Sequence, residues 1–237
     1  MNQSSTTAPS FTAITSTTST TKTWTASAAG TYYVWVKDVS GRTNKASFTV
    51  ASTAFGSTVT YICNGNRYTE TVSSGSSVLS PTTFTPSLSE ATFLGWSSSS
   101  SSTTVLTSKV ADGNSITLYA VFKYNDVSIG VLGGHYYEGN FSVTYSGAKY
   151  SSISITCKIG RWSGGEHASV HIKQTSPSVA MLNQYICSYG EEVDNKVLTA
   201  NFEPNGTYII YNELNGGDGG ARAGVKYGTL YGRTVVG

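Results

Sequence analysis

The chain has 237 residues, and its 15 basic and 13 acidic side chains give a formal net charge of +2. This balance, without a run of Lys and Arg, excludes the basic surface typical of nucleic-acid-binding proteins, and no apolar run approaches the ~20 residues of a membrane-spanning helix. Only 12 % of the residues are charged, while Ser, Thr, Gly and Tyr are frequent and favour strands and turns over helices. We therefore expect an all-β protein that binds no nucleic acid and does not insert into a membrane.

Residues 1–23 form a Ser/Thr-rich segment with one Pro and few apolar side chains. Such a segment cannot build a core of its own, and a polar tail is ordered only where something holds it. We expect an N-terminal arm that attaches the chain to a larger assembly. Its first ten residues are mostly polar and carry no charged side chain, which is not the pattern of a secretion signal.

Residues 24–54 contain a predicted hairpin, in which the alternating strands Thr31–Lys37 and Ala46–Val50 flank the turn signal Asp38–Arg42. This stretch resembles the closing hairpin of bacterial immunoglobulin-like repeats, with Arg42 where those repeats usually carry Asn. The resemblance covers half of such a domain. The partial immunoglobulin-like segment is therefore either cut from a longer domain or completed by a neighbouring domain or subunit.

Residues 55–124 begin with a strand at Val59–Cys63, the tight-turn pair Asn64-Gly65 and a second strand at Tyr68–Val72. A later strand is predicted at Ile116–Phe122. Gly95 is expected to let the backbone turn sharply between two large aromatic residues. The predicted core of this small domain consists of Tyr61, Phe93, Gly95, Trp96, Leu118 and Ala120.

This segment resembles the internalin-type B repeat, also called the Listeria–Bacteroides repeat, and Phe122 stands where that family usually closes with Trp. The resemblance implies a small β-grasp-like domain that serves as a spacer or adhesion module on cell surfaces and has no catalytic activity. The residues that carry it are Val59, Thr60, Tyr61, Asn64, Gly65, Pro81, Phe93, Gly95, Trp96, Thr117, Leu118, Tyr119 and Ala120.

Residues 125–237 contain short strands separated by Gly- and Asn-containing turns. In the clearest strand, Tyr150–Ile159, Ile and Cys alternate with Ser, Thr and Lys. This pattern predicts a β-sandwich or jelly roll. The other predicted strands are Val127–Val131, Phe141–Tyr145, Ala168–Gln174, Ala180–Cys187, Val197–Glu203, Thr207–Asn212 and Val225–Leu230.

The sequence contains no nucleophile elbow, zinc-protease motif, paired-cysteine motif or phosphate-binding loop. The Gly-rich stretch 215–224 lacks the Lys-Ser/Thr ending of a phosphate loop, and its single Asp218 cannot supply a calcium site. Glu191, Glu192 and Asp194 form an acidic cluster that we assign to a surface loop rather than to a glycosidase. We expect no enzymatic activity and no cofactor.

His167 and His171 lie four residues apart on a predicted strand. Four strand residues span about 13 Å, which is too far for two ligands at ~2 Å from one ion. We therefore expect exposed strand histidines and no metal site. His135, in a Gly-Gly-His-Tyr-Tyr turn, has no better support as a ligand.

A set of aromatic residues is a candidate for contact with a glycan or a partner, because rings stack on sugars and hydroxyls bond outward. The wider set includes Tyr208 and Tyr211, and the alternative is that most of these rings fill the core or a subunit interface. The candidates are Tyr136, Tyr137, Trp162, Tyr185 and Tyr189.

Three cysteines, Cys63, Cys157 and Cys187, leave at least one thiol without a partner in the chain. Cys157 and Cys187 are either bridged or free. Composition favours buried free thiols, which act as small hydrophobes.

Taken together, these features predict a non-enzymatic structural or display protein on the surface of a bacterial virus particle. It would be a head decoration, fibre or tail accessory protein, with an N-terminal attachment and an exposed C-terminal domain that contacts the host surface. Its partners would be other protein subunits, in a homo-oligomer or with capsid or tail proteins, and a cell-surface glycan is a further candidate. The alternatives are a fragment of a secreted adhesin, extracellular or on the bacterial cell surface, and a carbohydrate-binding module.

Overall fold

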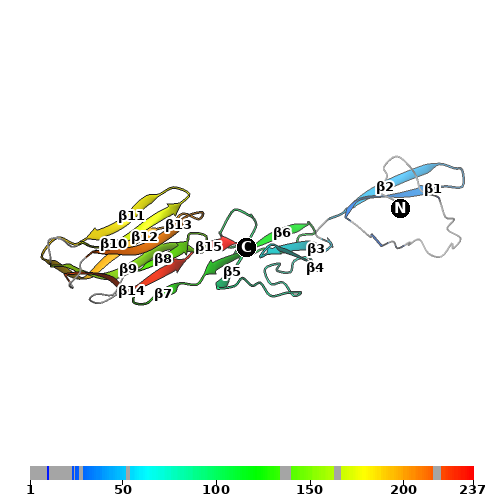
Figure 1. Cartoon of the computed structure of the whole chain (residues 1–237). Coiled ribbons are helices and arrows are strands. Elements are labelled where there is room, and N and C mark those ends of the chain that lie inside the picture. Colours follow the sequence, from blue (N-terminus) through cyan, green and yellow to red (C-terminus); the bar gives the residue numbers. More distant parts are fainter. Residues whose placement is uncertain are drawn as a thin grey trace. The chain divides into compact units, whose positions relative to one another are not determined.

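The computed structural model describes Ser10, Thr23, Thr25, Ala26 and residues 29–51, 54–133, 140–162, 167–215 and 220–237. Within these ranges the regular elements are strands, labelled β1 to β15 in Figure 1, and no α-helix occurs. Accordingly, no helix among the described residues is long and apolar enough to cross a membrane. The all-β class predicted from composition is confirmed.

The chain divides into two compact units. The first comprises residues 1–86, 95–120 and 237, and the second comprises residues 87–94 and 121–236. Strands β5 (Ala91–Ser97) and β6 (Ile116–Tyr124) contribute residues to both units.

The first sheet is a two-stranded hairpin of β1 (Gly30–Lys37) and β2 (Thr43–Val50), paired in register from one end to the other. Its turn is closed by Asp38, whose Oδ1 accepts from the Arg42 backbone N–H over 2.9 Å. Side chains along β2 are exposed almost throughout. Among the described strands, β1 and β2 pair only with each other.

A five-stranded sheet follows the order β15-β6-β3-β4, and β5 also pairs with β6. Its first hairpin turns at Asn64-Gly65, whose φ angles are +50° and +73°; this pair of positive values is the mirror-image turn that Asn-Gly favours. The parallel pairing of β3 with β6 brings Val59 opposite Ile116. The bounds not yet given are β3 (Ser57–Cys63), β4 (Asn66–Val72) and β15 (Thr234–Val236).

The remaining strands form two four-stranded antiparallel sheets in the second unit, ordered β11-β10-β13-β8 and β12-β9-β14-β7. The strands are β7 (Val127–Ile129), β8 (Ser142–Ser146), β9 (Tyr150–Arg161), β10 (His167–Ser176), β11 (Ala180–Ile186), β12 (Glu191–Asn201), β13 (Thr207–Asn215) and β14 (Ala221–Gly232).

The pairing of these eight strands is that of one long hairpin rolled up on itself. β10 pairs with β11 at its tip, and moving outward along the chain β9 pairs with β12, β8 with β13 and β7 with β14. Successive strand pairs lie alternately in the two sheets (Figure 1). This connectivity is a jelly roll, so of the two architectures expected for residues 125–237 the structure has the second.

The core of the jelly roll is built by alternation along β9 and β10. Ile153, Ile155 and Ile159 from β9 meet Val170 and Ile172 from β10, and all five are fully buried. Burial of each such side chain stabilises the fold by roughly 1.5–3 kcal/mol. The intervening side chains, polar on both strands, therefore point to the outer faces of the two sheets.

The prediction that β12 begins at Val197 was wrong, because the strand begins at Glu191. Its first half is charged and polar and so lacks the apolar alternation that marks a strand. It nevertheless pairs with β9 from Glu191 opposite Arg161 onward, with a register shift between Asp194 and Lys196.

Candidate functional site

The core predicted for the repeat lies mostly inside the protein. Tyr61, Trp96, Leu118 and Ala120 are at most 1 % exposed. The Tyr61 and Trp96 rings pack with their centroids 4.9 Å apart, and the Trp96 indole N–H donates to the Leu79 carbonyl over 3.1 Å. Phe93 is half-buried, and its ring meets the edge of Phe122 at 5.5 Å.

Gly95 does not lie at a turn, so that part of the prediction was wrong. It lies inside β5 with φ +143°, and a Cβ added there would lie 2.4 Å from Val105 Cγ1. Glycine is required at this position for a positive φ within a strand and for the close approach of Val105.

The Tyr61 hydroxyl lies 2.9 Å from both Glu70 Oε1 and the Val78 carbonyl oxygen. Burial and the Glu70 carboxylate raise the pKa of Tyr61. Burial also acts to raise the pKa of Glu70, but the Thr82 backbone N–H and the Tyr61 hydroxyl outweigh it, so this pKa lies below its ordinary value. This pair serves the packing of the repeat.

The aromatic residues proposed for glycan or partner contact occupy separate environments, and Tyr136 and Tyr137 lie outside the described residues. Trp162 is 37 % exposed. The Arg222 guanidinium stacks on its ring, with Arg222 Cζ 4.7 Å from the ring centroid. Tyr185 is half-buried and donates its hydroxyl to Glu191 Oε1. Tyr189 is 66 % exposed. Their role in recognition stays a prediction.

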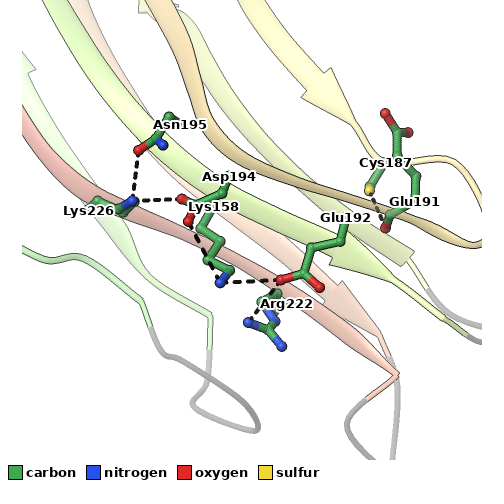
Figure 2. Close-up of polar contacts among 8 residues, drawn as sticks. All are labelled: Lys158, Cys187, Glu191, Glu192, Asp194, Asn195, Arg222 and Lys226. Atoms are coloured by element: carbon green, nitrogen blue, oxygen red, sulfur yellow. Dashed lines mark hydrogen bonds and ion pairs between the residues drawn. The ribbon is translucent and has the colours of Figure 1, made fainter.

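The acidic residues 191, 192 and 194 lie on strand β12 and not in a loop, so their placement in the sequence analysis was wrong. Figure 2 shows Glu192 and Asp194 facing cations from two neighbouring strands, whereas Glu191 lies apart from these cations, beside Cys187. Glu192 Oε1 lies 3.3 Å from both Lys158 Nζ and Arg222 Nη1, and Asp194 Oδ1 accepts from Lys226 Nζ over 2.6 Å.

Two carboxyl groups of the cluster have lowered pKa values. Hydrogen bonds from Tyr185 and the Ser188 backbone N–H lower the pKa of Glu191, and the Lys226 ammonium lowers the pKa of Asp194. A glycosidase needs one carboxyl group with a raised pKa to act as general acid. Glu192 and Asp194 instead lie among the cations Lys158, Arg222 and Lys226 on one face of the sheet β12-β9-β14-β7.

All three cysteines are buried free thiols, so Cys157 and Cys187 are not bridged. Burial raises the pKa of the Cys157 thiol to about 12 and, with help from Glu191, that of Cys187 to about 11. Thiols with such values are mostly protonated at neutral pH and are poor nucleophiles.

The prediction of two distant, exposed histidines was wrong. His171 is 4 % exposed, and the ligand atoms of His167, His171 and Glu213 all lie within 4.8 Å of one another. The length of the strand does not set the distance between the ring nitrogens, because both histidine side chains lean along the strand toward Ser169, which lies between the two residues. The Ser169 hydroxyl is 3.0 Å from His167 Nε2 and 2.7 Å from His171 Nε2.

The residues around His171 form a row across three strands. Gln184 on β11 and Tyr211 on β13 are its register partners. The Tyr211 ring stacks on the imidazole with centroids 4.7 Å apart, and Gln184 Oε1 lies 3.0 Å from Nδ1. An open hollow of about 420 Å³ continues along the same face beside Tyr211, with Lys173 and Ile209 in its lining.

Sequence reasoning missed Glu213, Ser169 and Gln184. The alternation His-x-Ser-x-His on one strand was a usable signal, because it places three polar side chains on one face. Glu213 could not be added without the register, which sets it opposite Ser169.

Comparison with known proteins gives one family. No curated protein matches the chain. The family model of the Listeria-Bacteroides repeat domain matches residues 58–121, the segment that holds β4, β5 and most of β3 and β6. This segment of the chain is therefore a Listeria–Bacteroides repeat domain, as its sequence resemblance indicated.

Proposed function

We propose that the chain is a non-enzymatic structural protein that displays its jelly roll on the surface of a bacterial virus particle, as a head decoration, fibre or tail accessory protein. The rolled hairpin of β7 to β14 carries this proposal, because the same architecture recurs in viral capsid and lectin domains. A fold hosts many functions, so the chain must also supply an attachment end and a spacer.

The N-terminal part of the chain is the proposed attachment end. The predicted arm, residues 1–23, lies outside the described residues except for Ser10 and Thr23, so the structural support comes from the hairpin β1–β2. An isolated two-stranded unit is marginally stable in water, and unpaired strand edges accept strands from other chains. Val36 and Phe48 on this hairpin are 57 % and 44 % exposed, although both are large and apolar. Its partners would be other subunits, either copies of this chain or capsid and tail proteins.

The Listeria–Bacteroides repeat fits a spacer in this scheme, and it also favours a second candidate. Repeats of this family are spacers and adhesion modules on cell surfaces, so the chain would then be part of a secreted bacterial adhesin. A carbohydrate-binding module is the third candidate, for which exposed Trp162 and Tyr189 would supply the stacking surface.

Antibodies against the chain distinguish these candidates. Immunogold electron microscopy should label purified virus particles released from the host, and leave intact uninfected cells unlabelled. Labelled cells with unlabelled particles would overturn the proposal in favour of the adhesin. A glycan array with the wild type and Trp162→Ala would detect the carbohydrate-binding candidate.

Attachment has its own control pair. Phe48→Lys should abolish incorporation into particles, because it places a charge on the exposed apolar side of β2. Tyr189→Lys, at an exposed position of the jelly roll, should leave incorporation unchanged. Equal incorporation of both variants would contradict attachment through the hairpin.

A further inference from the structure

Three side chains on the outer face of the sheet β11-β10-β13-β8 bring nitrogen and oxygen ligand atoms together. His167 Nε2 is 3.2 Å and His171 Nε2 is 3.6 Å from Glu213 Oε2. The opposite face of β10 carries Ala168, Val170 and Ile172, which are fully buried in the core. The strand that presents the histidines is therefore fixed by packing from behind.

His171 is held in the orientation that a metal ligand needs. The Gln184 amide oxygen, which can only accept a hydrogen bond, lies 3.0 Å from Nδ1 and favours the tautomer with a proton on that nitrogen. Nε2, which has the lone pair in this tautomer, faces Ser169 and Glu213. A hydrogen bond to the second ring nitrogen and a stacked neighbour, here Tyr211, are the outer contacts that orient metal-binding histidines.

The cluster brings several possible acceptor atoms together. The Ser169 hydroxyl lies 2.7 Å from His171 Nε2 and 3.0 Å from His167 Nε2. The Glu213 carboxylate adds further lone pairs, with Oε2 3.6 Å from His171 Nε2. A cation among these atoms would satisfy them together.

We propose that His167 Nε2, His171 Nε2 and Glu213 Oε2 bind a divalent transition-metal ion of the zinc class. Two imidazoles and one carboxylate suit zinc, nickel or copper, whereas calcium and magnesium require mainly oxygen ligands. Ligands at ~2.0–2.1 Å around a tetrahedral ion lie about 3.3 Å apart, close to the 3.2 and 3.6 Å found here.

The three ligand atoms lie within 4.8 Å of one another, so a side chain must move slightly for all three to reach one ion. His167 is the residue that can do so, because its side chain is 37 % exposed and has room to turn. Three protein ligands leave a fourth position for water. Glu213, with a side chain 54 % exposed, places that position on the solvent side of the sheet.

Isothermal titration of the metal-free full chain with zinc chloride tests this site. We expect one ion per chain and a rise in the melting temperature with zinc concentration, as mass action requires for a ligand of the folded state. Glu213→Gln and His167→Ala should each weaken binding by about 100-fold or more, and Gln184→Ala by about 10–100-fold. Cobalt(II) absorption in the wild type should report four-coordinate binding that these variants lose.

Two variants serve as controls. Glu203→Gln, at an exposed carboxylate in the turn after β12, should bind zinc as the wild type does. Ser169→Ala should also keep binding, because it removes no proposed ligand, whereas a purely hydrogen-bonded cluster would be broken by it. The proposal is overturned if zinc does not bind the wild type, or if Glu213→Gln and His167→Ala bind it with unchanged affinity.

Discussion

The Asn212 side-chain amide donates to the Ala223 carbonyl oxygen over 2.7 Å, joining β13 in one sheet of the jelly roll to β14 in the other. Its Oδ1 accepts from the Phe141 backbone N–H over 2.6 Å. Asn212 is 3 % exposed, so both backbone groups would be left without this partner in a mainly apolar interior if the amide were removed.

Asn212→Ala should therefore lower the free energy of unfolding by about 1–3 kcal/mol, the cost of leaving buried polar groups unsatisfied. Urea denaturation followed by circular dichroism measures this loss. Asn201→Ala, at an exposed position on β12, is the matched control and should change stability little. Equal effects of the two substitutions would contradict a bridging role for Asn212.

Gly95→Ala should destabilise the repeat for two separable reasons. The φ of +143° strains any residue with a Cβ, at a cost of about 1–3 kcal/mol, and the new methyl group would clash with Val105. Calorimetry should show a lower melting temperature, and adding Val105→Ala should restore only the part due to the clash. Gly130→Ala, where a Cβ meets nothing within 4 Å, should be near neutral.

Glu70 should make the repeat less stable in acid. Its pKa is lowered in the folded state, so its ionised form stabilises the fold above the unfolded value of ~4.3. That contribution is lost as the pH falls through the lowered value. Glu70→Gln should be less stable than the wild type at pH 7, and its urea midpoint should vary less between pH 6 and pH 3.

Tyr61→Phe removes one of the donors to Glu70 and should give an intermediate acid dependence. The acid dependence of the double variant should resemble that of Glu70→Gln alone, because both substitutions remove the same contact. Its stability at pH 7 should be lower, because Tyr61→Phe also removes the contact with the Val78 carbonyl. Additive effects on the acid dependence would show that the two side chains act independently.

Arg233 should be irreplaceable by Lys. Its Nε–H donates to the Gly147 carbonyl over 2.6 Å, and Nη2 donates to the carbonyls of Tyr150, over 3.2 Å, and Phe202. A planar fork can serve these acceptors at once, whereas an ammonium group cannot adopt the same geometry.

Arg233→Ala should thus cost roughly 1.5–3 kcal/mol of unfolding free energy, on the scale of hydrogen bonds from charged donors. Arg233→Lys should recover little of it in thermal or urea unfolding. Arg67→Lys, at an exposed position on β4, is the control and should leave the unfolding free energy unchanged. Full recovery by Lys would show that charge alone matters.

Local pattern was sufficient to place most strands but not their neighbours. The alternation in Tyr150–Ile159 predicted β9, because a two-residue period distinguishes the buried side chains of a strand from the outward-facing ones. It does not state that β9 lies between β12 and β14, which are distant in sequence. The charged start of β12 was missed for the complementary reason, since its pairing with β9 stabilises a segment that has no apolar pattern.

The candidate metal site shows the same limit. The His-x-Ser-x-His spacing is visible in the sequence, but the backbone distance between the two histidines, taken alone, speaks against a shared ion. The conformation of two side chains and the register that sets Glu213 opposite Ser169 decide the geometry, and neither follows from spacing. Gly95 was likewise recognised as required, although the reason is a strand conformation beside Val105 and not a turn.

The rolled hairpin also fixes the order in which the jelly roll can be completed during synthesis. β14 lies between β9 and β7, yet it leaves the ribosome after all the other strands of the roll. Until then β9 has an open edge toward its later neighbour, and nascent chains with open edges are prone to associate. Pairing between such distant strands predicts slow folding, in the range of milliseconds to seconds, and a domain that gains its interior only when its whole sequence has been made.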